Sequence, residues 1–203
     1  MNRVMTLGRH AAWSREVAAL AQLPPGGALL DVATGSGVIA LAAARRYPGA
    51  AVHGVDFAAR MLEAAAAKPG ASAVTWQYAD AYDLPFADGS FDAVTHGYLL
   101  RNVEDVERVL AEQHRVLKPG GRVVLLETCP PSFPVALGVR VVIPLLGRLV
   151  AGDRESYDYL QRSTLGFMTP PRVAAILRRV GFTAVESRKR FLGTQMIISA
   201  RKG

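Results

Sequence analysis

Hydrophobic positions along the chain follow two patterns that alternate. Short apolar runs of strand length are separated by stretches in which apolar residues recur at helical spacing. We expect strands over residues 28–34, 51–56, 74–80, 91–99 and 122–128. We expect helices over residues 15–23, 37–49, 57–70, 103–117 and 171–182. Proline and glycine punctuate several helix ends, as in Lys118-Pro119-Gly120-Gly121.

Strands that are apolar along their whole length and joined by helices imply a parallel sheet covered on both faces. The C-terminal part differs, because residues 183–190 and 194–201 read as two strands joined by "FLG", which predicts a hairpin at one sheet edge. The fold class is therefore α/β. We expect a Rossmann-like, seven-stranded, mostly parallel sheet with a C-terminal antiparallel hairpin and helices on both faces.

Composition places the chain among globular proteins of one domain. It has 203 residues, of which 50% are hydrophobic and 20% charged. Cys129 is the only cysteine, which excludes a secreted scaffold held by internal disulfides. The N-terminus has no apolar core of signal-peptide length. We therefore expect a cytoplasmic protein.

Positive charge is concentrated in the C-terminal third. Residues 1–131 carry 12 Lys+Arg and 13 Asp+Glu, a net of −1, whereas residues 132–203 carry 12 and 4, a net of +8. The arginines alternate with apolar residues over 134–152, which favours an anionic membrane surface over nucleic acid as partner. A general arginine bias with no partner is the alternative that stays open. Arg140 and Arg148 argue against a membrane span, because a central arginine costs about 2.5–3.5 kcal/mol on insertion scales.

Glycines and a carboxylate gather where the first predicted strand ends, in "DVATGSGVIA". Gly35 and Gly37 follow the strand and open a helix, so backbone N–H groups can approach a ligand closely. The spacing Gly35-x-Gly37-x-x-Ala40 would also fit a dinucleotide fingerprint. Asp31 argues against it, because a carboxylate is a poor neighbour for pyrophosphate. It suits a cationic ligand such as S-adenosylmethionine, which carries an ammonium and a sulfonium.

Two more carboxylates end the next two strands. Asp56 can accept hydrogen bonds from both ribose hydroxyls, although a helix N-cap is its alternative role. Asp80 can reach an adenine amino group, and the Ala81 N–H a ring nitrogen. Ligands bind at the carboxyl ends of strands in such sheets, so these groups should share one site. Arg101 and Asn102 follow the fourth strand, where the transferred group should lie.

These stretches carry a family resemblance. "DVATGSG", "GVDFAARML" and "YADAYDLPFADGSFDAV" resemble class I S-adenosylmethionine methyltransferases. "LLRNVED", "HRVLKPGGRVVLLETCPP", "VMTLGRHAAW" and "IPLLGRLVAGDRESYDYLQRS" resemble the UbiE/MenG family, which methylates a ring carbon in menaquinone and ubiquinone synthesis. The resemblance covers nearly the whole chain. "TQMIISAR" departs from the family's last strand, which leaves the exact acceptor open.

The resemblance implies cofactor contacts at Ser36, Asp56, Asp80, Ala81 and Gly97. Ser36 stands where the family often has Thr, and Gly97 where it often has Ser. With the residues named for their own chemistry, the candidate cofactor-binding residues are Asp31, Ala33, Gly35, Ser36, Gly37, Asp56, Phe57, Asp80, Ala81 and Gly97. Family members usually carry a further helix before the Met1-Asn2 pair, so either the start is misassigned or a covering helix is missing.

Methyl transfer to a ring carbon needs an electron-rich acceptor, and a hydroquinol becomes one as its hydroxyl loses a proton. Arg101 would stabilise the phenolate, and Asn102 would orient the second ring oxygen or a water. The alternatives are that Arg101 pairs with Glu104 or Asp105, and that Asn102 caps a helix opening at Val103. Further catalytic candidates are His10, His96 and Tyr157. No residue spacing suggests a metal site.

The expected function is S-adenosylmethionine-dependent C-methylation of a polyprenylated quinol, demethylmenaquinol to menaquinol being the first choice. Alternatives are another aromatic or small acceptor, a nucleic-acid-modifying protein and, last, a dinucleotide oxidoreductase. We divide the single domain into a cofactor-binding core (1–131), a substrate-covering, membrane-facing insertion (132–170) and a C-terminal helix and hairpin (171–203). We expect no nucleic-acid partner and peripheral contact with the inner face of the cytoplasmic membrane. A homodimer is left open.

Overall fold

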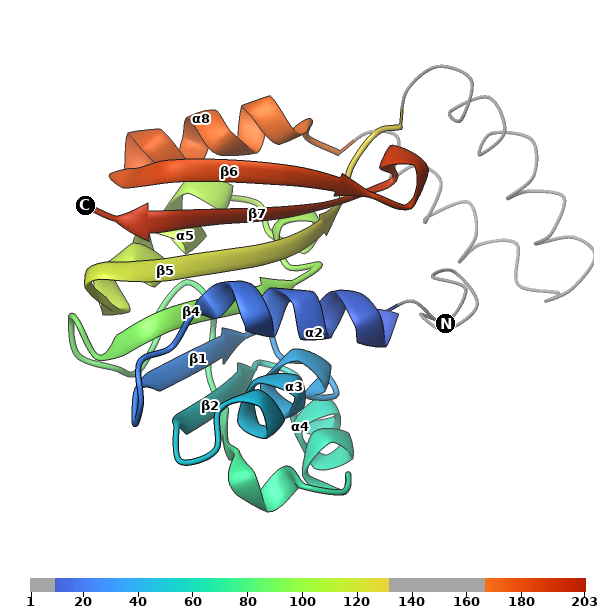
Figure 1. The fold of residues 1–203 in the computed structure, drawn as a ribbon, viewed down its shortest axis with the longest axis vertical. Helices are drawn as coiled ribbons and strands as arrows, with labels where there is room; N and C mark the ends of the chain where they lie inside the picture. The colour runs from blue at the N-terminus through green and yellow to red at the C-terminus, as the bar shows by residue number, and fades with distance from the viewer. Residues whose placement is uncertain (1–9, 132–166) are drawn as a thin grey trace, which may run out of the picture.

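The structure is a computed structural model that describes residues 10–131 and 167–203. Its strands form one seven-stranded sheet in the order β3-β2-β1-β4-β5-β7-β6 (Figure 1). The strands are β1 (Ala28–Val32), β2 (Ala51–Asp56), β3 (Thr75–Tyr78), β4 (Phe91–Gly97), β5 (Leu117–Thr128), β6 (Phe182–Arg190) and β7 (Gln195–Lys202). The α-helices are α2 (His10–Ala21), α3 (Val38–Arg46), α4 (Ala59–Ala66), α5 (Val106–Val116) and α8 (Pro170–Val180). Short 3₁₀ turns are η1 (Ala71–Ala73), η2 (Leu100–Asn102) and η4 (Phe191–Gly193).

The predicted fold class is confirmed. Strands β1 to β5 pair in parallel, and β7 runs antiparallel to both β5 and β6. The hairpin therefore lies at one edge, with its first strand outermost. The predicted subdivision at residues 132–170 falls almost wholly outside the described residues.

Several element boundaries differ from the prediction; the first helix, for example, begins at His10 rather than at residue 15. The helix expected from Val103 begins at Val106, because Asp105 is its N-cap and accepts a hydrogen bond from the Arg108 N–H at 2.9 Å. Strand β5 begins at Leu117 rather than at 122. The residues between form an irregularity in the pairing with β4, where Phe91 faces Leu117 and Ala93 faces Arg122.

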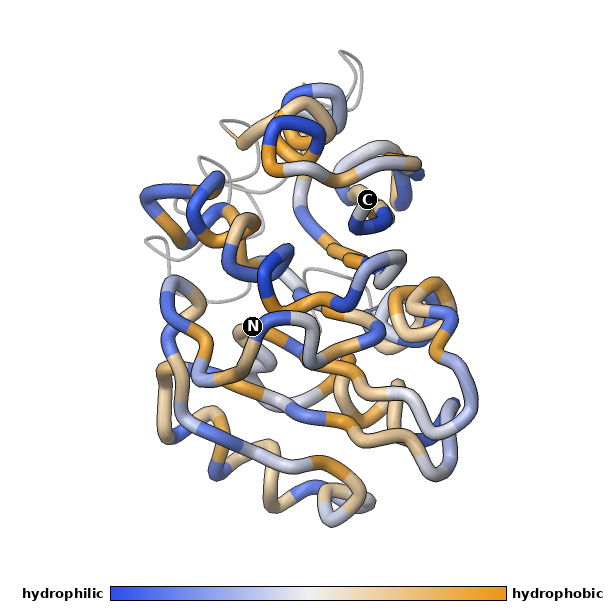
Figure 2. The backbone as a smooth tube through the Cα atoms, turned by 90° about the vertical axis from the view of Figure 1, so that its left-hand side faces the viewer, coloured by the Kyte–Doolittle hydropathy of each residue, from blue (hydrophilic) through white to orange (hydrophobic). Residues whose placement is uncertain are grey.

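Helices cover both faces of the sheet. Helices α2 and α3 pack on one face and α5 and α8 on the other (Figure 1). Hydrophobic and hydrophilic positions alternate along much of the chain in Figure 2. Helix α5 buries one side, whereas α3 is buried from Ile39 to Ala43. In α5, for example, Val109, Leu110 and Val116 are fully buried. In the described part of the chain no helix has both the length and the apolar character to cross a bilayer. Residues 133–150 lie outside that part.

The topology gathers the strand ends that build the site. Strands β1 and β4 are neighbours although β2 and β3 intervene in sequence, so the order of strand addition reverses between them. The parallel strands point to the same side, to the right in Figure 1. A ligand crevice is expected at this reversal.

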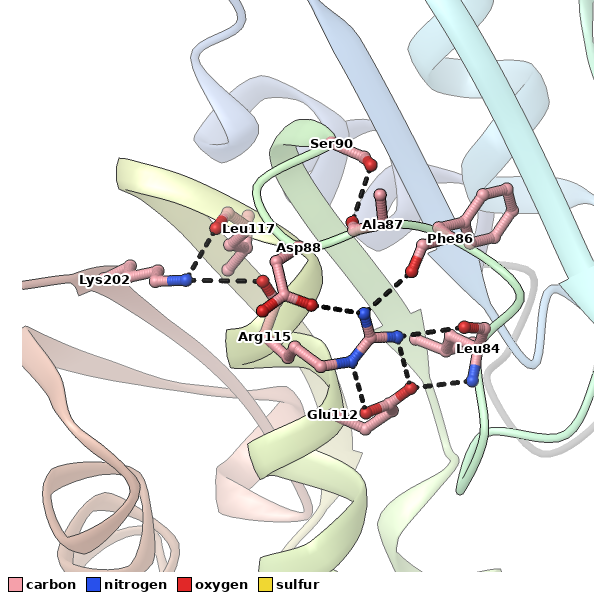
Figure 3. A network of polar contacts seen from close by, with 9 residues as sticks. All are labelled: Leu84, Phe86, Ala87, Asp88, Ser90, Glu112, Arg115, Leu117 and Lys202. Carbon is pink, nitrogen blue, oxygen red and sulfur yellow. Dashed lines mark hydrogen bonds and ion pairs between the residues drawn. The ribbon is translucent and has the colours of Figure 1, made fainter.

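Side chains of α5 hold the long loop between β3 and β4 in place (Figure 3). The Arg115 guanidinium donates hydrogen bonds to the carbonyls of Leu84 and Phe86 at 3.0 and 2.8 Å. It also pairs with Glu112 and Asp88, each at 2.7 Å. These carboxylates hold the pKa of Arg115 above its ordinary value. The loop is thereby tied to α5 at Leu84, Phe86 and Asp88.

Candidate active site

A cavity of about 960 Å³ opens at the carboxyl ends of β1, β2 and β4. Its volume is in the range of cofactor and ligand sites. Many of the residues predicted from the sequence lie in its lining: His10, Asp31, Ala33, Gly35, Ser36, Asp56, Phe57, Asp80, Ala81, Gly97, Arg101 and Asn102. The structure therefore brings residues from distant parts of the chain to one place.

Asp31 is a buried carboxylate at the base of this cavity. Its oxygens accept hydrogen bonds from the hydroxyls of Thr34 and Thr95, at 2.6 and 2.7 Å, and from the Ala40 N–H at 3.2 Å. Burial is the main cause that raises the pKa of Asp31 to about 6, against the lowering effect of these bonds. The carboxylate first holds the glycine turn in shape. A carboxylate has about four lone-pair sites, so one remains for a cationic ligand.

Asp56 ties the glycine turn to the next strand end. Its side chain accepts the Gly35 N–H at 2.7 Å and the Ala58 N–H at 2.9 Å. The N-cap position of α4 belongs to Ala58, so the alternative role of Asp56 as that N-cap is not what the structure shows. The carboxylate faces the cavity, where its remaining lone pairs can accept from vicinal hydroxyls.

An apolar rim surrounds this half of the cavity. Phe57 is 70% exposed and Tyr78 is 65% exposed, and with Met61 they line the opening. Asp80 follows β3 by two residues, rather than ending it as predicted, and lies beside this rim. Exposed aromatic faces beside a carboxylate suit a flat, polar-edged ring such as adenine.

Lys68 adds a cation that the sequence did not single out. Its Nζ donates to the Ser36 carbonyl at 2.6 Å, and the side chain lines the cavity beside the glycine turn. Partial burial lowers its pKa. Among residues 10–131 and 167–203 no carboxylate forms an ion pair with it. The ammonium can therefore receive an anionic group of a ligand.

The other half of the cavity is built on the turn that follows β4. Tyr98 has a left-handed backbone (φ 60°), which strains a non-glycine residue and is typical of functional sites. Its ring stacks on His10, with centroids 5.8 Å apart, and the Arg101 guanidinium lies 4.8 Å from the same ring. Burial, and then Lys68, lower the pKa of His10, which favours its neutral imidazole.

Arg101 carries the positive charge of this half. Its Nε is buried without a hydrogen-bond partner, and no described carboxylate forms an ion pair with its guanidinium. The alternative in which Glu104 or Asp105 neutralises it is therefore wrong for the described structure, and Asp105 caps α5 instead. Gly97 closes the floor beside it, where an added Cβ would come within 3.0 Å of Ile39.

Asn102 does not cap a helix. It lies in η2, where its Nδ2 donates to the Tyr98 carbonyl at 2.7 Å and its N–H to the Leu99 carbonyl at 2.9 Å. These bonds close the turn that presents Arg101. The amide lies at the cavity lining, so it is placed to meet a ligand while it stabilises the turn.

Glu127, at the end of β5, supports the same turn from behind. It is fully buried and accepts the Leu100 N–H at 2.7 Å, while its second oxygen has no partner. Burial raises the pKa of Glu127 to about 7, although the nearby Arg101 charge acts to lower it. This carboxylate ends a strand as Asp31 and Asp56 do, and that signal could have identified it.

Two of the sequence-predicted residues, Gly37 and His96, lie outside the cavity lining. Gly37 opens α3 outside the cavity lining, packed against Trp76. His96 is fully buried, with its Nδ1 3.1 Å from Gln113 Oε1, and burial lowers its pKa to about 4. It faces the core because residues alternate along a strand and Gly97 faces the cavity. Tyr157 lies outside the described residues. Those described hold no group of His, Cys, Asp and Glu able to bind a metal.

The chain resembles known proteins over most of its length. A family model described as the ubiE/COQ5 methyltransferase family matches residues 1–202. The ubiquinone/menaquinone biosynthesis C-methyltransferase UbiE of Desulfotalea psychrophila is 49% identical over 199 residues, covering 96% of this chain and 81% of that protein. The demethylmenaquinone methyltransferase of Deinococcus radiodurans is 41% identical over 189 residues, covering 90% and 78%.

A solved structure shares the fold. Phosphoethanolamine N-methyltransferase 2 of Haemonchus contortus, in complex with S-adenosyl-L-methionine, superposes with a TM-score of 0.70 at 18% identity, covering 94% of this chain and 52% of that one. At that identity the likeness concerns the fold alone. The match over residues 1–202 and the identities above 40% go further, and place this chain in the ubiE/COQ5 methyltransferase family.

Proposed function

We propose that this protein is an S-adenosylmethionine-dependent methyltransferase that methylates a ring carbon of a polyprenylated quinol, with demethylmenaquinol as acceptor. One observation carries the proposal. A single cavity joins a half lined by Asp31, Asp56 and Asp80 to a half that holds the unpaired guanidinium of Arg101. The acceptor class follows from the relatives, which are named as a ubiquinone/menaquinone biosynthesis C-methyltransferase and a demethylmenaquinone methyltransferase.

The residues of the first half fit S-adenosylmethionine group by group. Asp56 would hold the ribose hydroxyls, and Asp80 with the Ala81 N–H the edge of adenine between Phe57 and Tyr78. Asp31 would favour the cationic end, and Lys68 would receive the α-carboxylate. The bound cofactor would supply an electrophilic methyl group, carried on its sulfonium sulfur.

The second half would prepare the acceptor. Arg101 stabilises a phenolate oxygen as the hydroquinol loses its proton, which makes the ring carbon electron-rich. The neutral imidazole of His10 is the best-placed described group to take that proton, because it lines the cavity beside Tyr98. The ring carbon would take the methyl group as the S–CH3 bond breaks and S-adenosylhomocysteine leaves, so the opposite charges neutralise each other, which a site closed to water favours. The methylated ring carbon would then lose its hydrogen as a proton, and one proton would return to the phenolate oxygen, which restores the aromatic quinol. Alignment of acceptor and methyl group is the main contribution of the fold.

The β6–β7 turn would bring this opening to an anionic membrane, where a prenylated quinol resides. Leu192 is 73% exposed at the turn, and Arg188 and Lys189 before it are exposed. The turn lies at the side of the sheet toward which the parallel strands point (Figure 1), and the cavity opens at the carboxyl ends of these strands. An apolar side chain beside cations suits an anionic lipid surface. The fraction of protein that co-sediments with phosphatidylglycerol vesicles should fall as salt is added, and it should also fall in Leu192→Asp. Binding that is unchanged by salt and by the substitution would refute this role.

Titration calorimetry tests the cofactor and acceptor together. S-adenosylhomocysteine should bind, and a short-chain demethylnaphthoquinol should bind more tightly once it is present. Asp56→Asn and Lys68→Met should both lower the affinity for S-adenosylhomocysteine. Only Lys68→Met should lose the preference for S-adenosylhomocysteine over its analogue without the α-carboxylate. Absence of S-adenosylhomocysteine binding would overturn the proposal. If the cofactor bound and the quinol did not, the proposed methyltransferase activity would stand, and the acceptor would be another aromatic or small molecule.

A further inference from the structure

The turn that carries Arg101 is held from three sides. Glu127 accepts the Leu100 N–H at 2.7 Å, and the Tyr98 hydroxyl donates to Gln195 at 3.0 Å. These two supports come from β5 and β7 of the sheet. The third support is the Tyr82 hydroxyl, which accepts the N–H groups of Glu104 and Asp105 at 2.9 and 3.0 Å.

The third support belongs to the loop that lines the cofactor half. Tyr82 follows Asp80 and Ala81 directly, and its own N–H donates to Asp80 Oδ1 at 3.0 Å. All three residues line the cavity. The Arg108 guanidinium lies 5.2 Å from the Tyr82 ring and fixes its direction. One short loop thus carries the Asp80 carboxylate and, through Tyr82, hydrogen-bonds to the segment before α5.

The Tyr82 hydroxyl is the partner of both N–H groups in the structure. Glu104 and Asp105 precede the first helical residue, Val106, so their N–H groups have no partner within the helix. A hydroxyl has two lone pairs, and here each accepts one of them. A displacement of Tyr82 would therefore release the segment just after Arg101.

We infer that Tyr82 is a positioning residue that couples occupation of the cofactor half to the order of the Arg101–Asp105 turn. The inference rests on the proposed function, because it takes Asp80 and Ala81 as cofactor contacts. A ligand that orders Asp80 and Ala81 orders Tyr82, and Tyr82 then holds the turn in the conformation that presents Arg101. If the bound cofactor raises the affinity for a ligand on Arg101 by some factor, that ligand should raise the affinity for the cofactor by the same factor.

Residue-resolved amide hydrogen exchange tests the coupling without turnover. In the wild-type protein, saturating S-adenosylhomocysteine should slow exchange at the Glu104 and Asp105 amides. In Tyr82→Phe these amides should exchange faster and no longer respond, while the affinity for S-adenosylhomocysteine changes less than about twofold. Loss of one or two neutral hydrogen bonds should lower kcat/KM for the quinol by about five- to tenfold.

Tyr47→Phe is the matched control, since it also removes a hydroxyl with two backbone contacts. The Tyr47 hydroxyl donates to the carbonyls of Ala18 and Ala19, at 3.0 and 3.3 Å, outside the cavity lining. In Tyr47→Phe, S-adenosylhomocysteine should still slow exchange at the Glu104 and Asp105 amides. Binding of S-adenosylhomocysteine with no change at Glu104 and Asp105, or an equal response in Tyr82→Phe, would overturn the coupling alone. Failure of the wild-type protein to bind it would overturn the proposed function as well.

Discussion

At the scale of single residues, the unpaired cation is the feature that most needs a reason. Arg101 is half-buried, its Nε has no partner, and its neighbours are the rings and backbone of the Tyr98 turn. A buried N–H without a hydrogen-bond partner costs free energy in the resting protein, even with the Glu127 carboxylate nearby. An anionic group that arrives with the acceptor would compensate that cost.

Replacing Arg101 tests this directly. We expect Arg101→Met to lower kcat by about 10²–10³-fold, as for other residues that stabilise an oxyanion. Arg101→Lys should recover only part of the loss, because an ammonium lacks the flat face that lies on Tyr98. The affinity for S-adenosylhomocysteine, measured by calorimetry, should stay within about twofold. A kcat near the wild-type value in Arg101→Met would remove Arg101 from the mechanism.

The pKa of Asp31 predicts how cofactor affinity depends on pH. Burial raises this pKa from 3.8 to about 6, so the folded protein favours the protonated carboxyl. The protonated form stabilises the fold below pH 3.8, and this stabilisation is lost as pH rises through 6. A cationic ligand favours the ionised form. We therefore expect S-adenosylmethionine to bind about tenfold more weakly at pH 5 than at pH 7.5. Circular dichroism at both pH values controls for unfolding, and a flat affinity would contradict the role of Asp31.

At the scale of elements, the glycine turn between β1 and α3 shows why one glycine outside the cavity is still required. Gly37 has a left-handed backbone (φ 76°), and an added Cβ would lie 2.5 Å from Trp76. The tight packing of α3 on β2 and β3 therefore depends on this position.

Gly37→Ala should lower the free energy of unfolding by about 2–4 kcal/mol, from left-handed strain and overpacking together. Gly49→Ala is the matched comparison, because Gly49 is also left-handed (φ 84°) but an added Cβ would meet nothing within 4 Å. It should lose about 1–2 kcal/mol. Equal losses in the two variants, measured by urea unfolding, would show that Trp76 packing is not the cause.

The elements and the strand-end carboxylates were predictable from the sequence, because periodicity and topology are local or general signals. The cavity-facing position of Lys68 was not, since it depends on how a helix end folds over the Ser36 carbonyl. Asp105 rather than Asn102 caps α5, since η2 intervenes and moves the helix start. Nor did a pattern indicate Tyr82, whose partners lie more than twenty residues further along the chain.

At the scale of the whole molecule, the sheet separates a reactive edge from a buried interior, in which burial disfavours the charged form of titratable groups. His96 and Gly97 are adjacent, yet only Gly97 reaches the cavity. Burial lowers the pKa of His96 from 6.5 to about 4, so the folded protein holds a neutral imidazole. This contribution to stability is complete above pH 6.5 and is lost as pH falls through 4.

His96→Asn should reduce that acid sensitivity. Asparagine can still donate to Gln113, but it cannot take up a proton. The wild-type protein should lose up to about 3 kcal/mol relative to the variant between pH 7 and pH 4. The variant's own packing defect does not depend on pH, so it cancels from this difference. Parallel stability profiles, from urea unfolding at each pH, would exclude His96 as an acid-sensitive site.

The central claim is that both halves of the cavity act on one reaction, and the fate of the methyl group tests it most directly. The wild-type protein would be incubated with S-adenosylmethionine carrying a deuterated methyl group and with a short-chain demethylnaphthoquinol. The product would be located by mass spectrometry and NMR. The account predicts a deuterated methyl on the ring carbon, formed far more slowly by Arg101→Met. A methyl on oxygen, or no transfer despite binding of both ligands, would contradict it.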